Sequence, residues 1–170
     1  MKKWCLGLVF LLLSGCAAPA WETVTDEIPA VAVSSWMEDA YSVQFGVPAS
    51  ASLLEERAGW QVYGTENGEL EIETRTFLTS GLESAVRTVS GFESDELTIL
   101  QTARFGMPQY QFAWVAQTEQ GSRLYRANLV LNDTECYAVI CSRPEEAGSR
   151  YDQEIRRVFS SFGLYTDEGV

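Results

Sequence analysis

The chain contains no histidine, and its only lysines are Lys2 and Lys3. The lack of histidine excludes Ser-His-Asp and Cys-His catalysis and every metal site built on imidazole. Glycine-rich phosphate loops are missing as well, because the sequence has neither a GxGxxG nor a GxxxxGK motif. Carboxylates are therefore the only abundant side chains left for acid–base chemistry.

The first sixteen residues have the layout of a secretory signal peptide. Lys2 and Lys3 precede an apolar run from Leu6 to Leu13, and the segment ends in Leu-Ser-Gly-Cys at Cys16. The run is much shorter than the roughly 20 apolar residues that cross a bilayer. The last four residues resemble the lipobox of bacterial lipoproteins, which implies cleavage after residue 15 and acylation of Cys16. The alternative is an ordinary signal peptide with a chance cysteine.

Removal of residues 1–15 takes away both lysines and no acidic residue, so the formal charge changes from −12 to −14. An acidic surface of this kind repels nucleic acid and anionic lipid headgroups, and neither is expected as a partner. The charge favours a cationic partner or serves solubility alone. The remaining 155 residues are enough for one domain with a substantial core.

Cys136 and Cys141 are the cysteines that remain after processing at Cys16. They lie five residues apart in one predicted strand, which places them on opposite faces and about 16 Å apart. A disulfide needs Cα atoms within about 7 Å, so we expect two free thiols in or near the core.

The chain divides into four segments by composition. Residues 1–15 form the signal peptide, residues 16–38 the lipidated N-terminus and a tether, residues 39–165 one domain, and residues 166–170 a tail. The tether is rich in Ala, Pro, Ser and Thr. Part of it, Ile28 to Val33, could instead add an edge strand.

The hydrophobic periodicity predicts an α+β domain in which helices pack on an antiparallel sheet of about six strands. One helix is expected after a capping box at Ser80 and Glu83, with Gly91 as its C-cap, and a second over residues 150–162. Residues 50–59 are expected to form a helical turn or a loop. Strands are expected over residues 41–47, 60–63, 69–77, 96–104, 109–118, 123–131 and 135–142.

The order of these elements, with F-G-V-P at Phe45, G-W-x-V at Gly59 and I-R-R-V-F-S-S-F at Ile155, resembles the PsbP/Mog1-type fold of many small bacterial lipoproteins. The resemblance covers residues 41–164, and the residues that carry it are mainly core and turn positions. It implies an accessory or binding protein of a larger assembly and not an enzyme. It assigns no functional residue.

Aromatic residues are the candidates for ligand binding. Tyr110, Phe112 and Trp114 share one face of a predicted strand, and Trp60 lies on another. These four residues could line a pocket or a sugar platform, or the row could belong to the core.

Clusters of carboxylates offer a further possibility. Glu69, Glu71 and Glu73 share a strand face and could serve a glycosidase or bind calcium. No segment matches an EF-hand loop, so no metal site, cofactor or catalytic residue is predicted.

The sequence thus favours a non-enzymatic lipoprotein that is anchored outside the cytoplasm through Cys16 and binds another protein of the cell envelope. A lipoprotein that binds a small ligand or a glycan through its aromatic face is the alternative. A carboxylate-based hydrolase is a third hypothesis.

Overall fold

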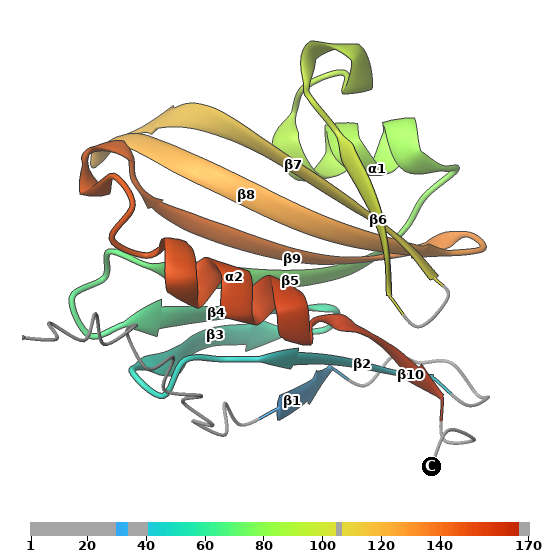
Figure 1. Cartoon of the computed structure of the whole chain (residues 1–170), viewed down its shortest axis with the longest axis horizontal. Coiled ribbons are helices and arrows are strands. Elements are labelled where there is room, and N and C mark those ends of the chain that lie inside the picture. The colour runs from blue at the N-terminus through green and yellow to red at the C-terminus, as the bar shows by residue number, and fades with distance from the viewer. Residues whose placement is uncertain (1–29, 34–40, 105–106, 167–170) are drawn as a thin grey trace, which may run out of the picture.

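The computed structural model describes residues 30–33, 41–104 and 107–166 (Figure 1). The predicted signal peptide, the lipidation site Cys16 and most of the predicted tether lie outside these residues. The described chain forms two antiparallel sheets and two α-helices, a mostly β arrangement of the α+β class.

The large sheet has seven strands in the order β3-β4-β5-β9-β8-β7-β6. Most neighbouring strands of this sheet are also consecutive in the sequence and are joined by hairpins. The exception is the pair β5 and β9, between which α1 and β6–β8 occur in the sequence. The strands are β3 (Ala51–Arg57), β4 (Trp60–Thr65), β5 (Glu71–Leu78), β6 (Leu100–Arg104), β7 (Met107–Thr118), β8 (Gly121–Asn132) and β9 (Glu135–Pro144).

The small sheet has the order β1-β2-β10, and it joins the start of the described chain to its end. In its register Leu164 of β10 lies opposite Val43 of β2, and Val31 of β1 lies opposite Phe45. Its strands are β1 (Ala30–Val33), β2 (Tyr41–Gly46) and β10 (Gly163–Thr166).

The two helices cover opposite faces of the large sheet, and β2 packs on the same face as α2, with Phe45 of β2 against Tyr63 of β4 (Figure 1). Helix α2 (Asp152–Ser161) buries Ile155 and Val158 in a core shared with β2, β4, β5 and β9. Helix α1 (Leu82–Ser90) buries Ala85 and Val86 in a second core on β7, β8 and β9. Strand β9 contributes to both cores, and because it is covered on both faces it is buried at every position except its two ends.

The structure has more than the predicted six or so strands, because three segments that were not expected as strands, residues 30–33, 51–57 and 163–166, also pair into the sheets. Residues 51–57, expected as a helical turn or loop, are edge strand β3. A register shift between Leu53 and Glu55 breaks the two-residue alternation there, and the strand is mostly exposed, so no apolar pattern marks it. Residues 30–33, expected in the tether, pair with β2 as the edge-strand alternative requires.

Two further local predictions differ from the structure. The segment predicted as a strand from residue 96 begins with a 3-10 turn (Ser94–Glu96), and β6 starts only at Leu100. The capping box at Ser80 and Glu83 is wrong, because Gly81 is the N-cap of α1 and no side chain caps it. Gly91 is the C-cap in the left-handed conformation, as predicted.

Gly59 and Gly68 lie in two tight turns and have similar left-handed backbone conformations but different surroundings. Both have φ near +67° (Gly59 +67°, Gly68 +66°), but a Cβ at Gly59 would lie 2.9 Å from the Thr76 carbonyl oxygen, whereas a Cβ at Gly68 meets nothing within 4 Å. Gly68→Ala should lower the free energy of unfolding by about 1–2 kcal/mol through the left-handed backbone alone. Gly59→Ala should cost measurably more in urea unfolding, and equal losses would show that the contact with Thr76 is unimportant.

The free thiols predicted at Cys136 and Cys141 are confirmed, and both are buried. Cys136 faces the core under α1, and Cys141 faces the core under α2. Burial raises the pKa of the Cys136 thiol to about 12 and also raises the pKa of Cys141. Because the thiolate is the reactive form, iodoacetamide should modify neither residue in the native chain and both in urea. Peptide mass spectrometry reads each cysteine separately, and rapid native labelling of either would contradict the burial.

Candidate functional site

The predicted aromatic candidates fall into two places that are far apart in the large sheet. Tyr110, Phe112 and Trp114 lie on β7 and face α1, while Trp60 begins β4. Three strands, β5, β9 and β8, separate β4 from β7, so the structure does not bring the four residues together.

The row on β7 lies mainly in the core. Phe112 and Trp114 are 4% and 9% exposed, and their rings stack at 5.7 Å between centroids. Trp114 also stacks on Tyr125 of β8 at 5.2 Å. The stack packs with the residues under α1, so the alternative that assigns the row to the core explains its position. Ligand binding by these residues stays a prediction.

Trp60 is fixed by charged neighbours on both sides. Its indole Nε1 donates a hydrogen bond to Glu73, and the Arg57 guanidinium lies 3.8 Å from the centroid of its ring. Arg75 lies on β5 directly opposite Trp60 of β4, and its guanidinium donates to the same Glu73 carboxylate at 2.6 Å. These contacts make Trp60 part of a surface cluster in which the Glu73 carboxylate already forms an ion pair with Arg75.

The carboxylates of the third hypothesis are each paired with an arginine. Besides Glu73, Glu69 pairs with Arg150 at 2.6 Å and Glu71 with Arg123 at 3.7 Å. A general acid needs a carboxyl whose pKa is raised. In contrast, the hydrogen bonds from Tyr151 and Arg150 hold the pKa of Glu69 below its ordinary value. The arrangement is that of a structural network.

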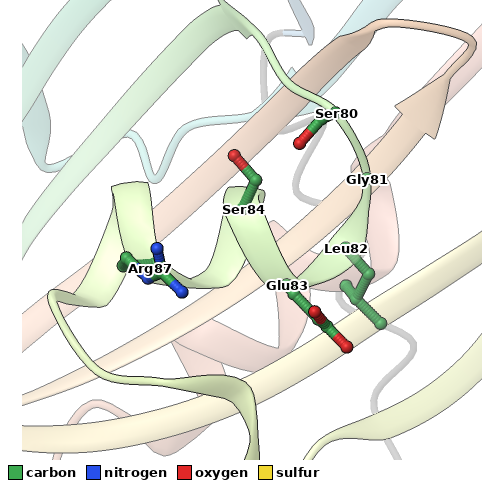
Figure 2. Close-up of a pocket in the computed structure, with 6 residues that line it drawn as sticks. All are labelled: Ser80, Gly81, Leu82, Glu83, Ser84 and Arg87. Atoms are coloured by element: carbon green, nitrogen blue, oxygen red, sulfur yellow. The ribbon is translucent and has the colours of Figure 1, made fainter.

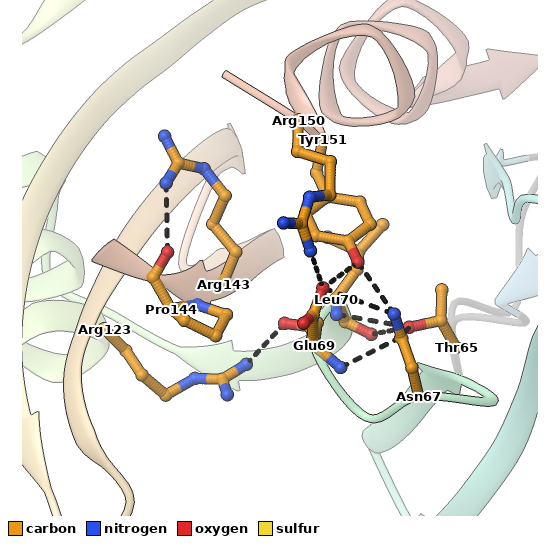
Figure 3. Close-up of polar contacts among 9 residues, drawn as sticks. All are labelled: Thr65, Asn67, Glu69, Leu70, Arg123, Arg143, Pro144, Arg150 and Tyr151. Carbon is orange, nitrogen blue, oxygen red and sulfur yellow. Dashed lines mark hydrogen bonds and ion pairs between the residues drawn. The ribbon is translucent and has the colours of Figure 1, made fainter. Parts of the chain in front are cut away.

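Figure 3 shows how this network connects α2 to the turn between β4 and β5. Tyr151, at the N-cap of α2, donates its hydroxyl to Glu69 and accepts a hydrogen bond from Asn67 at 2.9 Å. The Arg123 side chain on β8 donates to the Glu69 carbonyl at 3.1 Å. The network therefore fixes the position of the helix on the sheet.

A hollow lies at the start of α1 (Figure 2). Unlike the Glu69 network, it is not formed by several elements that meet in space. Every residue that lines it belongs to the single segment from Ser80 to Arg87. Arg87, the cation in this segment, is paired with Glu93 at 2.5 Å. The hollow is the open end of one short helix and offers no group held for a ligand.

A pocket of about 490 Å³ lies between the flank of α2 and strands β6, β7 and β8. Arg104, Arg126 and Arg156 come to it from β6, β8 and α2, three elements that are well separated in the sequence. The other lining residues are Thr102, Ala103, Gln109, Gln111, Phe159 and Ser160. Among the described residues that line the pocket there is no acidic side chain, so the pocket is locally positive in an acidic protein.

Buried amides fix the floor of this pocket. Gln109, which is buried, donates to the Phe162 carbonyl at 2.9 Å and accepts a hydrogen bond from Asn128 at 3.2 Å. The Arg126 guanidinium lies 5.7 Å from the centroid of the Phe159 ring, which supports its position over the helix. The pocket therefore combines guanidinium groups with amide side chains, which are hydrogen-bond donors suited to an anionic group.

Sequence reasoning did not predict the arginine pocket, although a signal for it exists. On β7 the face that carries Tyr110 and Phe112 is aromatic, whereas the opposite face carries Gln109 and Gln111. A strand that is apolar on one face and polar on the other indicates a site or solvent on the polar side. Which of the two applies depends on Arg156, which only the docking of α2 places there.

The network around Glu69 predicts a dependence of stability on pH. Because folding lowers the pKa of Glu69 from its ordinary value of 4.5, the network stabilises the fold at neutral pH. This contribution is lost as the pH falls below 4.5 and through the lower folded value. Glu69→Gln should therefore reduce the midpoint of urea unfolding at pH about 7, and its difference from wild type should shrink at pH about 3.

The matched control for this measurement is Glu66→Gln, which removes an exposed carboxylate from the same turn. It should leave the pH profile of the unfolding midpoint close to that of wild type. A difference between wild type and Glu69→Gln that stayed constant with pH would contradict the assigned role of the carboxylate.

Two general features complete the description of the site. Among the described residues, no group of three or more His, Cys, Asp or Glu side chains is placed to hold a metal ion. In the same part of the chain, no helix combines the length and the apolar character required to cross a membrane.

Comparison of the sequence with known families and with characterised proteins finds no match. Solved structures do match in three dimensions. Cyanobacterial PsbP (CyanoP) from Synechocystis superposes with a TM-score of 0.55 at 14% identity, over 80% of this chain and 92% of that protein. LpqN of Mycobacterium tuberculosis, described as involved in cell envelope biogenesis, gives a TM-score of 0.52 at 13% identity, over 84% and 97%.

A protein of Bacteroides thetaiotaomicron gives a TM-score of 0.53 at 8% identity and covers 78% of this chain. The chain spans about half of that protein's length, 51%. At these identities the likeness concerns the fold. The chain has a PsbP-like fold, as the order of its sequence elements indicated.

Proposed function

We propose that the chain is a non-enzymatic accessory module of a cell-envelope assembly, anchored outside the cytoplasm by a lipid on Cys16. The observation that carries the proposal is the combination of a lipobox-like Leu-Ser-Gly-Cys segment with a PsbP-like domain later in the same chain. LpqN, which is structurally similar, is described as involved in envelope biogenesis, and this supports a role of the same kind. Firm attachment requires more than one acyl chain, as mature lipoproteins of this type carry.

The internal pairing of the carboxylates supports a binding role over hydrolysis. Glu69, Glu71 and Glu73 are each within reach of an arginine, and each arginine also contacts the surrounding structure. A second candidate, the binding of a small ligand, is favoured by the pocket beside α2 and not by the aromatic residues that first suggested it.

The anchoring can be tested with Cys16→Ala. We expect this variant to leave the membrane fraction after a high-salt wash or to accumulate uncleaved, because the acyl acceptor is gone. Wild-type protein should stay with the membranes and gain the mass of the lipid. Retention of cleaved Cys16→Ala protein on washed membranes would contradict lipid anchoring.

The accessory role can be tested by crosslinking the intact lipoprotein in its own cells, followed by purification and mass spectrometry. Repeated recovery of one envelope complex, absent from the Cys16→Ala control, is the expected result. Recovery of nothing above that control would overturn the assignment to an assembly.

A further inference from the structure

The pocket beside α2 differs from the surroundings of most other arginines in this protein. Five arginines form ion pairs with carboxylates of the chain itself, within the part that the structure describes: Arg75, Arg87, Arg123, Arg143 and Arg150. Four others, Arg57, Arg126, Arg156 and Arg157, form no such ion pair within the same residues. Arg57 lies over the Trp60 ring and Arg157 does not line the pocket, which leaves Arg126 and Arg156. Both line the pocket, next to Arg104.

The placement of Arg126 and Arg156 around one pocket costs electrostatic free energy in the unliganded protein. Like charges held around one pocket repel each other, and the described lining offers no carboxylate to offset this. An anionic group in the pocket would relieve the repulsion and accept hydrogen bonds from guanidinium groups and from the amide of Gln111. The chemistry of the lining therefore selects a ligand with several negative charges close together.

An apolar strip extends along the same face of the sheet. Leu100 on β6 lies opposite Gln111, and its side chain is 58% exposed. Val115, four residues after Gln111 on β7 and therefore on the same face, is 42% exposed. The strip offers an apolar surface next to the arginines, which a free inorganic anion would leave unused.

We propose that this pocket and strip bind an acidic segment of a protein partner, with carboxylates at Arg126 and Arg156 and apolar side chains against Leu100 and Val115. The inference rests on the proposed function, because it names the chemistry of the partner in the assembly. Charge complementarity identifies the occupant. A membrane surface or a nucleic acid is a broad polyanion that would also face the acidic remainder of the chain, whereas a short peptide can contact the pocket and the adjacent strip without doing so.

Binding of a defined peptide tests the proposal. Purified lipidated protein in an uncharged detergent is titrated into a fluorescein-labelled peptide of repeated Glu-Glu-Leu units, with a Gln-Gln-Leu peptide as the neutral comparison. Fluorescence anisotropy should show that the acidic peptide binds at least about tenfold more tightly, with an affinity that falls as salt is added. Equal affinities for the two peptides would overturn the proposal.

Helix α2 provides a matched pair of variants. Arg156→Glu reverses a charge in the pocket, and Arg157→Glu makes the same change at the next residue, which does not line it. Arg156→Glu should lower the affinity for the acidic peptide at least about tenfold, and Arg157→Glu should lower it by less than about twofold. Circular dichroism verifies the fold. If Arg156→Glu does not fold, Arg126→Gln and Arg156→Gln replace it, and unchanged binding by a folded pocket variant would overturn the proposal.

Inorganic phosphate and vesicles of anionic phospholipid distinguish the other possible occupants. At constant ionic strength, neither should displace the acidic peptide at concentrations at which unlabelled peptide does so. Displacement by phosphate would assign the pocket to a small anion, and displacement by vesicles would assign it to lipid, and either outcome would overturn the proposal.

The crosslinking experiment separates this inference from the proposed function. If wild-type protein recovers an envelope complex and Arg156→Glu recovers it as well as Arg157→Glu does, the pocket is not the contact and only the inference fails. If wild-type protein recovers nothing above the Cys16→Ala control, the proposed function itself fails. Selective loss of the complex in Arg156→Glu, together with peptide binding, is the expected result.

Discussion

The burial of β9 on both faces is the constraint on which the rest of the structure depends. Its side chains enter the core under α1 on one side and the core under α2 on the other, so both helices are placed by one strand. Cys136 and Cys141 illustrate the arrangement, because an odd spacing on this strand gives each core one thiol. The pocket beside α2 lies where the flank of that helix meets β6, β7 and β8.

Much of this fold could be predicted from the periodicity of the sequence, because long strands with one buried face alternate clearly. For β5, β7, β8, β9 and both helices, the predicted bounds lie within a few residues of the observed ones. Edge strand β3 was missed because it is exposed and contains a register shift, so neither burial nor alternation marks it. The predicted N-cap of α1 at Ser80 differs from the observed one because Gly81, with a φ of 143°, occupies that position. A Ser-x-x-Glu pattern at residues 80–83 resembles a capping box whether or not the serine is the N-cap.

The candidate site was less predictable, since it depends on contacts between distant segments. Arg104, Arg126 and Arg156 have no special spacing in the sequence, and each alone is an ordinary solvated cation. The aromatic residues were conspicuous in the sequence, but large aromatic side chains on a half-buried strand commonly serve the core. Only the folded chain brings Arg126 and Arg156 to one pocket, away from the carboxylates that pair with arginines such as Arg75 and Arg150.

The small sheet has a consequence for how the protein is made. Strand β2 receives its partner β10 only from the last described residues of the chain, with Val43 opposite Leu164. Both side chains belong to the core under α2, together with Phe45 and Phe162. A chain that emerges from its N-terminus first therefore exposes the apolar side of β2 until α2 and β10 have followed. This core closes late, as expected for a topology dominated by contacts between sequence-distant segments.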